Sequence, residues 1–483
     1  MKTSEGSTSS PKLMIAMILA VSMSFIDQTI VAIASPDLQR DLHLAGTQSQ
    51  WVINAYIVAL AATFALGGRV ADVWGRRRMV ITGVIGFAVT SALCGATPST
   101  SWAEAWLIAA RAGQGVFAAL LLPAAIAIVY AGAKPERRGR AMAMFFGFTG
   151  AFTALGPILG SSLLHWSWRG VFWVNLPVAA AALALIAVTQ VPDTRARGRI
   201  DWRGAVVVAA GMALSVVGFT QSASWGWDSP ATWSCLAAGA VLLAAFVVLQ
   251  LRTAEPLVDV QMFRLRGFRV DSAVLFLAMM AFVPVVYFLS LYASVSLGLG
   301  AGGTSQLMLR FFLGYLIAAQ LGGRVFDRYG AKSTILLGCV VGAAGFLWWA
   351  TQVTTLSVDA QKLPLLVAGA GIGLLLGPSS ADAVSRGSDA SYGAITGINQ
   401  TVRNYGSALG IAVLGTLLLH VAKHASITQA APHAFAQGMQ AILIGMAAAL
   451  GLAFLVALRH PGDRPSRSTD HSRAQKAGAR VVA

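Results

Sequence analysis

Residues 68–78 read Gly-Arg-Val-Ala-Asp-Val-Trp-Gly-Arg-Arg-Arg, and a related stretch, Gly-Arg-Val-Phe-Asp-Arg-Tyr-Gly, occupies residues 323–330. Two glycines and an aspartate recur, and each matched position lies 255 residues from its copy. Such an internal repeat predicts a chain built from two related halves. Paired halves are typical of membrane transporters that work by alternating access.

The composition around this repeat is that of a membrane protein. Of 483 residues, 56% are hydrophobic and 11% are charged, whereas soluble domains carry about a quarter charged residues. The first apolar run has no cleavage site after it, so we expect a retained helix rather than a signal peptide. Cys94, Cys235 and Cys339 stand alone in apolar runs, which excludes a disulfide framework and predicts packing roles.

Fourteen apolar runs are long enough to cross a bilayer, which takes about 20 helical residues. The expected spans are 13–35, 49–70, 79–98, 103–130, 140–164, 171–191, 204–221, 231–251, 269–297, 304–325, 333–352, 363–384, 393–421 and 437–458.

The net charge of +16 does not indicate nucleic-acid binding, because the basic residues lie in short loops between the apolar runs. Most of the 35 lysines and arginines fall on the side of the N-terminus if every run crosses the membrane once. The opposite side holds only Arg40, Arg169, Lys362 and Lys423. Since cytoplasmic loops retain positive charge, we expect both termini in the cytoplasm.

These observations predict an all-α membrane protein of two six-helix bundles plus two inserted helices. The repeat pairs spans 1 to 6 with spans 9 to 14 and leaves spans 7 and 8 as the insertion. The expected parts are a cytoplasmic tail (1–12), a first bundle (13–191), inserted helices with linkers (192–268), a second bundle (269–458) and a basic tail (459–483).

The stretch 68–78 resembles the loop between helices 2 and 3 of the major facilitator superfamily. The resemblance implies a gating motif that locks one conformation, whereas the simpler interpretation is a basic cytoplasmic loop with a helix-ending aspartate. The simpler interpretation explains neither the glycine spacing nor the second copy. The motif residues are Gly68, Asp72, Gly75, Arg76, Gly323, Asp327 and Gly330.

Further motifs resemble the fourteen-helix drug:proton antiporters of that superfamily and cover nearly the whole chain. The fifth span carries Gly156, Pro157 and Gly160, a pattern associated in that family with export. Ser161 stands where a second glycine is usual. The other matches are Asp27, Thr29 and Pro36; Leu107, Arg111, Gln114 and Gly115; residues 168–177; and Gly393, Gly397, Asn399, Arg403, Gly406 and Gly410.

Asp27 and Arg111 are the expected proton-coupling residues. An aspartate near the centre of a membrane helix costs about 2.5–3.5 kcal/mol, so Asp27 should face the bundle interior. Desolvation favours the protonated carboxyl, as proton coupling requires. Arg111 in the fourth span is its expected partner, and the resemblance implies a role in proton translocation. A protonated structural aspartate and a purely structural charge pair are the alternatives.

A substrate cavity is expected among polar and aromatic residues of the spans, although helix packing explains many of them equally well. The candidates are Phe25, Tyr56, Gln114, Phe148, Phe152, Tyr287, Arg310, Asn399 and Arg403. His420 and His424 have helical spacing but no accompanying carboxylate, so no metal site is expected. The sequence also lacks a phosphate-binding loop and a nucleophile elbow, so we expect no cofactor, no ATP-driven step and no enzyme.

The resulting prediction is a proton-coupled antiporter in the cell membrane that exports amphipathic or cationic drugs, antibiotics or dyes by alternating access. Its partners would be the substrate, protons and the bilayer, and it would act as a monomer. An exporter of one metabolite or lipid, and a receptor or scaffold that transports nothing, remain the alternatives.

Overall fold

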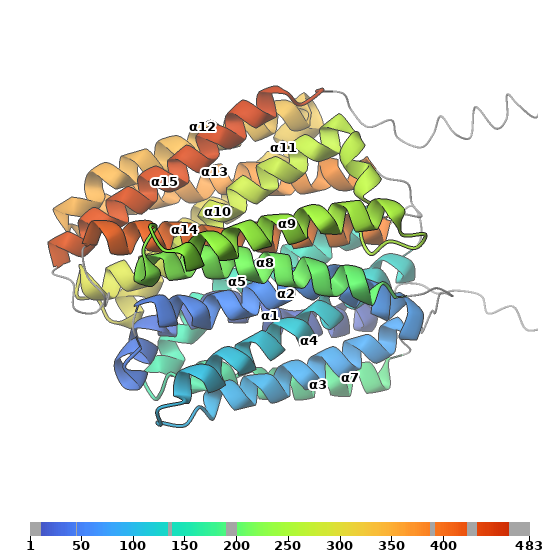
Figure 1. Ribbon diagram of the computed structural model, residues 1–483, viewed down its shortest axis with the longest axis horizontal. Helices are drawn as coiled ribbons and strands as arrows, with labels where there is room; N and C mark the ends of the chain where they lie inside the picture. The colour runs from blue at the N-terminus through green and yellow to red at the C-terminus, as the bar shows by residue number, and fades with distance from the viewer. Residues whose placement is uncertain are drawn as a thin grey trace, which may run out of the picture.

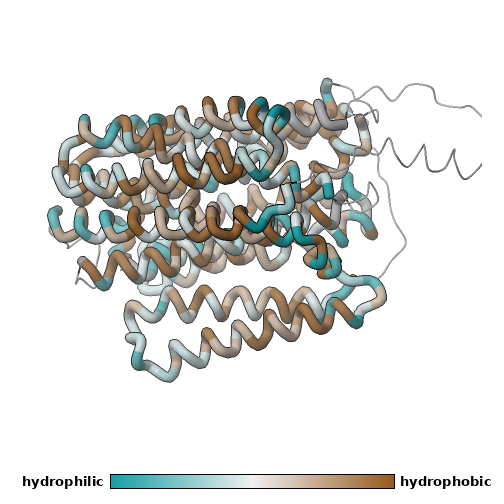
Figure 2. The backbone as a smooth tube through the Cα atoms, turned by 90° about the horizontal axis from the view of Figure 1, so that it is seen from above, coloured by the Kyte–Doolittle hydropathy of each residue, from teal (hydrophilic) through white to brown (hydrophobic). Residues whose placement is uncertain are grey.

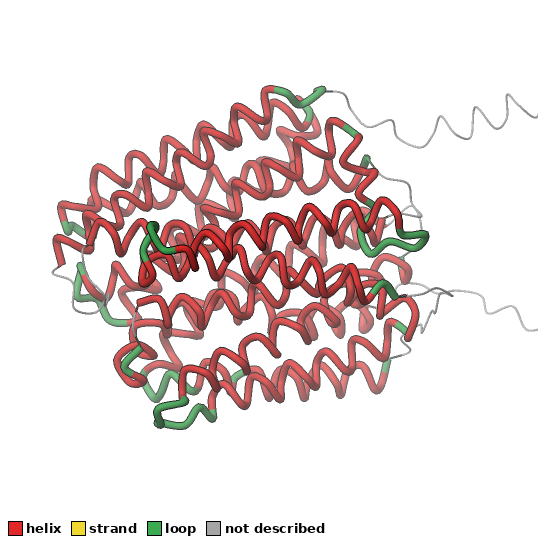
Figure 3. The backbone as a smooth tube through the Cα atoms, viewed as in Figure 1, coloured by secondary structure: helices red, strands yellow, loops and turns green. Residues whose placement is uncertain are grey.

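The computed structural model describes residues 11–44, 46–133, 138–189, 200–386, 392–422 and 432–462. Within these ranges the chain forms helices joined by short turns, and no strand is present (Figure 3). The helices are α1 (Pro11–Leu42), α2 (Gly46–Trp74), α3 (Arg76–Gly95), α4 (Ala103–Gly132), α5 (Arg138–Leu164), α6 (Gly170–Trp173), α7 (Asn175–Val188), α8 (Trp202–Trp225), α9 (Pro230–Arg252), η2 (Val260–Arg264), α10 (Arg266–Val295), α11 (Ala301–Tyr329), α12 (Ala331–Gln352), η3 (Val353–Thr355), α13 (Val358–Ser385), α14 (Tyr392–Ala422) and α15 (Pro432–Leu458).

These helices match the fourteen expected spans one to one, because the short helix α6 continues into α7 as a single span. Twelve spans in the described part of the chain are long and apolar enough to cross a membrane by themselves. The other two are α5 and α11. The predicted all-helical, fourteen-span architecture is therefore confirmed, and the largest differences in boundary are extra turns on spans predicted too short.

The helices of the two halves lie side by side, and α8 and α9 cross the face toward the viewer between them (Figure 1). Seen from above, this helical hairpin stands beside the main bundle (Figure 2). It packs against α2 of the first half and α14 of the second half. An apolar cavity of about 470 Å³ lies between α2, α8, α9 and α14, lined by Leu66, Met212, Phe246, Ile398 and Val402 among others.

The two ends of the bundle differ in charge. We call the end that carries the α2–α3 turn, with Arg76, Arg77 and Arg78, the basic end, and the opposite end the far end. Two hydrogen bonds join the halves toward the far end. The Tyr287 hydroxyl donates to Ser49 Oγ at 3.1 Å, and the Ser305 hydroxyl donates to the Pro157 carbonyl at 2.6 Å. These bonds hold the two halves together toward the far end.

Some of the close helix contacts lie at prolines inside the helices. A helical proline has no N–H, so the carbonyl four residues earlier loses its helical hydrogen bond. Pro123 in α4 frees the carbonyl of Ala119 in this way, and Gly67 of α2 approaches that carbonyl so closely that a methyl group on Gly67 would overlap it. Glycine is therefore required at position 67 by packing.

The same arrangement occurs in the second half. Pro378 in α13 frees the carbonyl of Leu374, and a methyl group at Gly322 of α11 would lie 3.3 Å from that oxygen. These residues are again displaced by 255 positions from their counterparts in the first half. The repeat seen in the loop motif thus extends to the packing of neighbouring helices.

Candidate functional site: a buried ion pair in the first half

Asp27 and Arg111 meet inside the first half of the bundle. Arg111 Nη1 donates to Asp27 Oδ2 at 2.6 Å, and the side chains of Arg111 and Asp27 are 1% and 0% exposed. Gln114, one turn after Arg111 on α4, donates from Nε2 to the second carboxylate oxygen at 3.1 Å. Both oxygens of Asp27 therefore accept hydrogen bonds from α4.

Arg111 also binds helix α2. Its Nε donates to the carbonyl oxygen of Val52 at 2.9 Å, and its guanidinium lies 4.6 Å from the ring centre of Tyr56. Nη1 makes a further 2.6 Å hydrogen bond to Gln114 Oε1. One guanidinium thus connects α1, α2 and α4, and a change in the charge of Asp27 acts on all three helices.

Two residues after Asp27, helix α1 contacts the glycine and proline motif of α5. Pro157 frees the carbonyl of Thr153, and the Thr29 hydroxyl donates to that oxygen at 2.9 Å. A methyl group at Gly156 would overlap Thr29, and one at Gly160 would lie 3.1 Å from Ile30. The predicted antiporter motif therefore forms the surface on which the Asp27 segment of α1 packs.

The first copy of the gating motif forms a closed turn at the basic end. Asp72 accepts hydrogen bonds from Arg76 Nε at 3.0 Å and Nη2 at 2.8 Å. Gly75 has φ = 110°, a left-handed conformation that favours glycine. Gly68 has ordinary contacts, with the nearest atom 3.6 Å from a built methyl group, so the close approach expected of Gly68 belongs to its neighbour Gly67.

The second copy keeps the turn but changes the charges. Gly330 has φ = 83°, like Gly75 in the first copy. Ala331 stands where the first copy has Arg76, and Arg328 follows Asp327 directly. No atom lies within 4 Å of a methyl group built on Gly323. The paired Asp72 and Arg76 geometry is therefore a property of the first copy.

The residues expected in a substrate cavity occupy different places. Tyr56 and Gln114 belong to the surroundings of Arg111, and Tyr287 makes the hydrogen bond between the halves described above. Arg310 donates to the Gln306 carbonyl on the exposed surface of α11 and lies near Asp359. The remaining candidates are Phe25 and Phe152, both packed on the core, Phe148, which is exposed, and Asn399 and Arg403 on α14.

A second charged cluster lies at the basic end of the second half. His460 Nε2, just after α15, is 3.2 Å from Asp382 Oδ2 and 3.5 Å from Asp271 Oδ1. Arg386 Nε is 2.6 Å from Asp382 Oδ2 and 3.7 Å from Asp271 Oδ2. The cluster ties together α10, α13 and the end of α15. Nothing in the one-dimensional spacing of the sequence connects the two aspartates.

The electrostatics of this cluster favour a charged imidazole. Burial lowers the pKa of His460, but hydrogen bonds and attraction from Asp271 and Asp382 outweigh it and raise the pKa to about 9. The Gly462 N–H lies 3.1 Å from Nδ1 and donates to it only when that nitrogen is unprotonated. The protonated ring gives up this single hydrogen bond for its attraction to two carboxylates.

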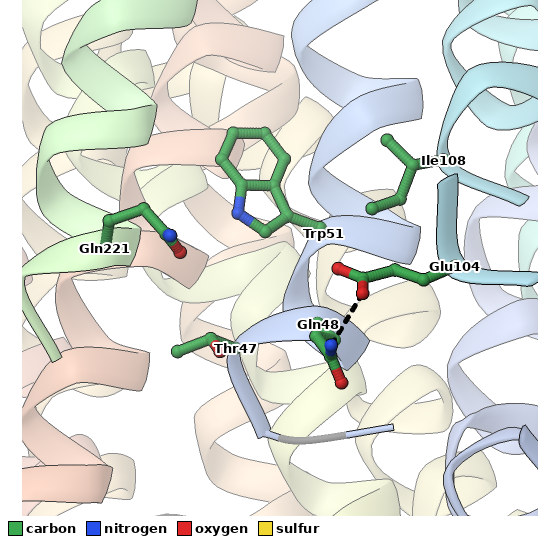
Figure 4. Close-up of a pocket in the computed structure, with 6 residues that line it drawn as sticks. All are labelled: Thr47, Gln48, Trp51, Glu104, Ile108 and Gln221. Atoms are coloured by element: carbon green, nitrogen blue, oxygen red, sulfur yellow. Dashed lines mark hydrogen bonds between the residues drawn. The ribbon is translucent and has the colours of Figure 1, made fainter. Parts of the chain in front are cut away.

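A polar pocket of about 490 Å³ opens toward the far end (Figure 4). Gln48 of α2 donates to the Glu104 carboxylate of α4 at 2.6 Å, while Trp51 and Gln221 face the same space. Gln221 belongs to α8, so the inserted hairpin helps to line this pocket. Sequence alone presented Glu104 as a helix-terminal carboxylate and gave no sign of the pocket.

Comparisons with known proteins agree with this architecture. The chain is 34% identical over 431 residues to the cephamycin export protein CmcT of Amycolatopsis lactamdurans, covering 86% of each chain. It is 31% identical over 408 residues to the tetracenomycin C resistance and export protein of Streptomyces glaucescens, covering 84% of this chain and 75% of that protein.

The fold is similar to solved transporter structures. A D-xylose-proton symporter superposes with a TM-score of 0.66 at 13% identity, covering 94% of this chain and 99% of that chain. The sequence profile of the Major Facilitator Superfamily matches residues 17–411, which takes in the ion pair, the loop motif and most of the second half. This chain is a multi-span membrane transporter and belongs to the major facilitator superfamily.

Proposed function

We propose that this protein exports amphipathic small molecules in exchange for protons, with Asp27 as the proton-binding group and Arg111 as the residue that responds to its charge. The observation that carries the proposal is the fully buried ion pair between them, at a contact of 2.6 Å. Membrane-embedded ionisable groups are costly and mark ion and proton pathways. Relatives named for antibiotic export support the direction of transport.

Protonation of Asp27 is the coupling step in this proposal. The proton removes the negative charge, so the pair with Arg111 loses its attraction and one carboxyl oxygen becomes a donor. Arg111 then keeps the Val52 carbonyl, Gln114 and the rings of Tyr56 and Phe172 as partners. Breaking a buried pair by neutralising one member costs about 3–5 kcal/mol. That free energy is large enough to shift α4 and α2 relative to α1.

The contacts between the halves toward the far end support a cycle in which substrate enters from the basic end. The hydrogen bonds Tyr287 to Ser49 and Ser305 to Pro157 must break before the far end can open. Pro157 also lies in the α5 surface that packs on the Asp27 segment. Protonation at Asp27 and opening at the far end therefore share one helix contact, which supports a coupled alternating-access mechanism.

The decisive experiment uses purified protein in acid-loaded vesicles that contain a trapped pH dye. Addition of tetracenomycin C or a cephamycin should release protons from the lumen with the wild-type protein. Asp27→Asn and Arg111→Ala should abolish this response. Asp359→Asn is the matched control, because Asp359 is an exposed acid that pairs with Lys362 on the surface. Full coupling in both site variants would rule out the proposal.

The same assay separates the rival functions. A transporter of one metabolite or lipid would respond to a single compound in a broad panel while still depending on Asp27. A receptor or scaffold would release no protons and would tolerate Asp27→Asn in its cellular role. The expected substrates include cations as well as neutral amphipathic molecules, so the panel should contain both.

We further infer a monomer in the cell membrane with both termini in the cytoplasm and with the two six-helix bundles bounded at 13–191 and 269–458. The basic loops support this orientation. A green fluorescent protein joined after residue 483 should fluoresce, because it folds in the cytoplasm. Absence of fluorescence from a correctly inserted fusion would reverse the orientation.

A further inference from the structure

A second arginine lies deep in the bundle without a carboxylate partner. Arg403 is the twelfth residue of α14, so it lies roughly 16 Å from the start of that helix, near the middle of the span. Among the residues that the structure describes, its side chain makes no ion pair and no hydrogen bond. The Arg403 side chain is partly exposed.

Within the described ranges, no acid is placed to neutralise this charge. Asp27 lies deep in a span but already pairs with Arg111. Asp271 and Asp382 lie in the turns nearest the basic end, where Arg386 and His460 balance them. Arginine remains charged in proteins, and a bare guanidinium in a membrane interior is unfavourable. The interior of the second half therefore carries an uncompensated positive charge.

A neighbouring amide adds another donor without an acceptor. Asn399 lies four residues before Arg403, so both side chains leave the same face of α14. Asn399 is 4% exposed, and its Nδ2 has no hydrogen-bond partner in the described structure. A buried donor left unsatisfied costs about 1–3 kcal/mol. Two kinds of donor on one face require a ligand that supplies acceptor oxygens.

The wall beside these donors is aromatic. Tyr315 of α11 lies within electrostatic reach of Arg403. The Tyr315 ring is 5.3 Å from that of Phe282, and Phe282 lies 6.1 Å from Phe311 and 6.2 Å from Phe312. Phe282, Phe311 and Phe312 are buried, whereas Tyr315 is partly exposed. The exposed part of the Tyr315 ring can therefore contact a planar apolar group bound beside Arg403.

We infer that Arg403 and Asn399 bind an acidic oxygen group, a carboxylate or phenolate, on an aromatic substrate. This inference rests on the proposed export function and makes it more specific, since it favours anionic over cationic substrates. A guanidinium binds carboxylates in a charge-assisted, bidentate geometry. Asp27 does not offer an equivalent site for a cation, because both of its oxygens are occupied by Arg111 and Gln114.

The test uses two dyes that share a xanthene ring system, anionic fluorescein and a cationic rhodamine ester. Binding to the purified full-length protein is measured by fluorescence anisotropy at a pH where fluorescein is ionised. The wild-type protein should bind fluorescein more tightly. Arg403→Gln should weaken fluorescein binding about tenfold or more, as expected for loss of a charge-assisted hydrogen bond, and leave rhodamine binding unchanged.

Two further variants keep the test interpretable. Arg403→Lys keeps the charge and should retain part of the preference for fluorescein. Arg310→Gln removes an arginine from the surface of α11, near Asp359, and should bind both dyes like the wild type. A wild-type protein that prefers rhodamine or distinguishes neither dye overturns the inference, and this comparison needs no variant to fold. Equal weakening of both dyes in Arg403→Gln also overturns it.

The experiments can separate the binding of anions at Arg403 from the proposed proton antiport. Arg403-dependent fluorescein binding without substrate-induced proton release keeps this inference and rejects proton antiport. Proton release that depends on Asp27 but is driven equally by the cationic dye, with no effect of Arg403→Gln, keeps antiport and rejects the anionic site.

Discussion

The hydroxyl of Thr29 donates a 2.9 Å hydrogen bond to the carbonyl oxygen of Thr153, which Pro157 has released from the α5 helix. This bond joins α1 to α5 two residues beyond Asp27. The carbonyl that Pro157 leaves without a helical hydrogen bond in α5 accepts one from a side chain of α1 instead. This contact helps to fix the position of the Asp27 segment.

Replacement of Thr29 by valine should therefore destabilise the protein. The Thr153 carbonyl would remain buried without a donor, at a cost of about 1–3 kcal/mol. Thr29→Ser keeps the hydroxyl and should lose much less. Thermal unfolding of the purified protein in detergent measures both variants, and equal melting temperatures for valine and serine would contradict the assigned role of this hydrogen bond.

Asp27 and Arg111 should show strong energetic coupling. Each single change, Asp27→Asn or Arg111→Gln, leaves its partner in an unbalanced buried site and should destabilise the protein by about 3–5 kcal/mol. The double variant should be more stable than the sum of the two single changes predicts, since neither charge is then left alone. A double-mutant cycle in denaturant measures this coupling, and additive effects would show that the two side chains do not interact.

Glycines 67 and 68 should differ sharply in their tolerance of alanine. A methyl group at Gly67 overlaps the Ala119 carbonyl, whereas one at Gly68 meets its nearest atom at 3.6 Å. Overpacking typically costs about 1–3 kcal/mol, so Gly67→Ala should lower the melting temperature and Gly68→Ala should leave it near the wild-type value. Any transport defect of Gly68→Ala would then report a role in motion rather than in packing.

His460 should make stability depend on alkaline pH. Its pKa in the folded protein is raised to about 9, above the ordinary value of 6.5, so the folded state holds the proton more tightly. The resulting stabilisation is fully present below about pH 6.5 and is lost as the pH rises through about 9. Melting temperatures measured across this range should fall with pH, and His460→Gln should flatten that dependence.

The sequence predicted the number and order of the spans because apolar run length and loop charge are local signals. It also predicted the partnership of Asp27 and Arg111, since a deep acid and a deep base in one bundle need each other. The cluster of Asp271, Asp382 and His460 was missed. Its members lie on three elements far apart in the chain, and only the packing of α10, α13 and α15 brings them together.

In some places the structure gives a contact to a different residue from the one that the sequence indicated. The loop motif pointed to Gly68, but the proline of α4 places the close contact at Gly67. Arg310 and Arg403 looked alike as arginines within spans, yet Arg310 makes an exposed hydrogen bond along its own helix and Arg403 lies near Tyr315 of α11. A sequence pattern gives the depth of a residue in a helix more reliably than it gives the direction in which the side chain points.

The hairpin of α8 and α9 touches α2 in one half and α14 in the other, and the apolar cavity lies where these four helices meet. If the halves rock against each other, that cavity must widen or collapse during every cycle, and lipid tails or hydrophobic solutes would be drawn in or expelled. The hairpin would then move relative to both halves in every cycle. A chemical crosslink from α8 to both α2 and α14 would stop transport without altering Arg111 or Arg403.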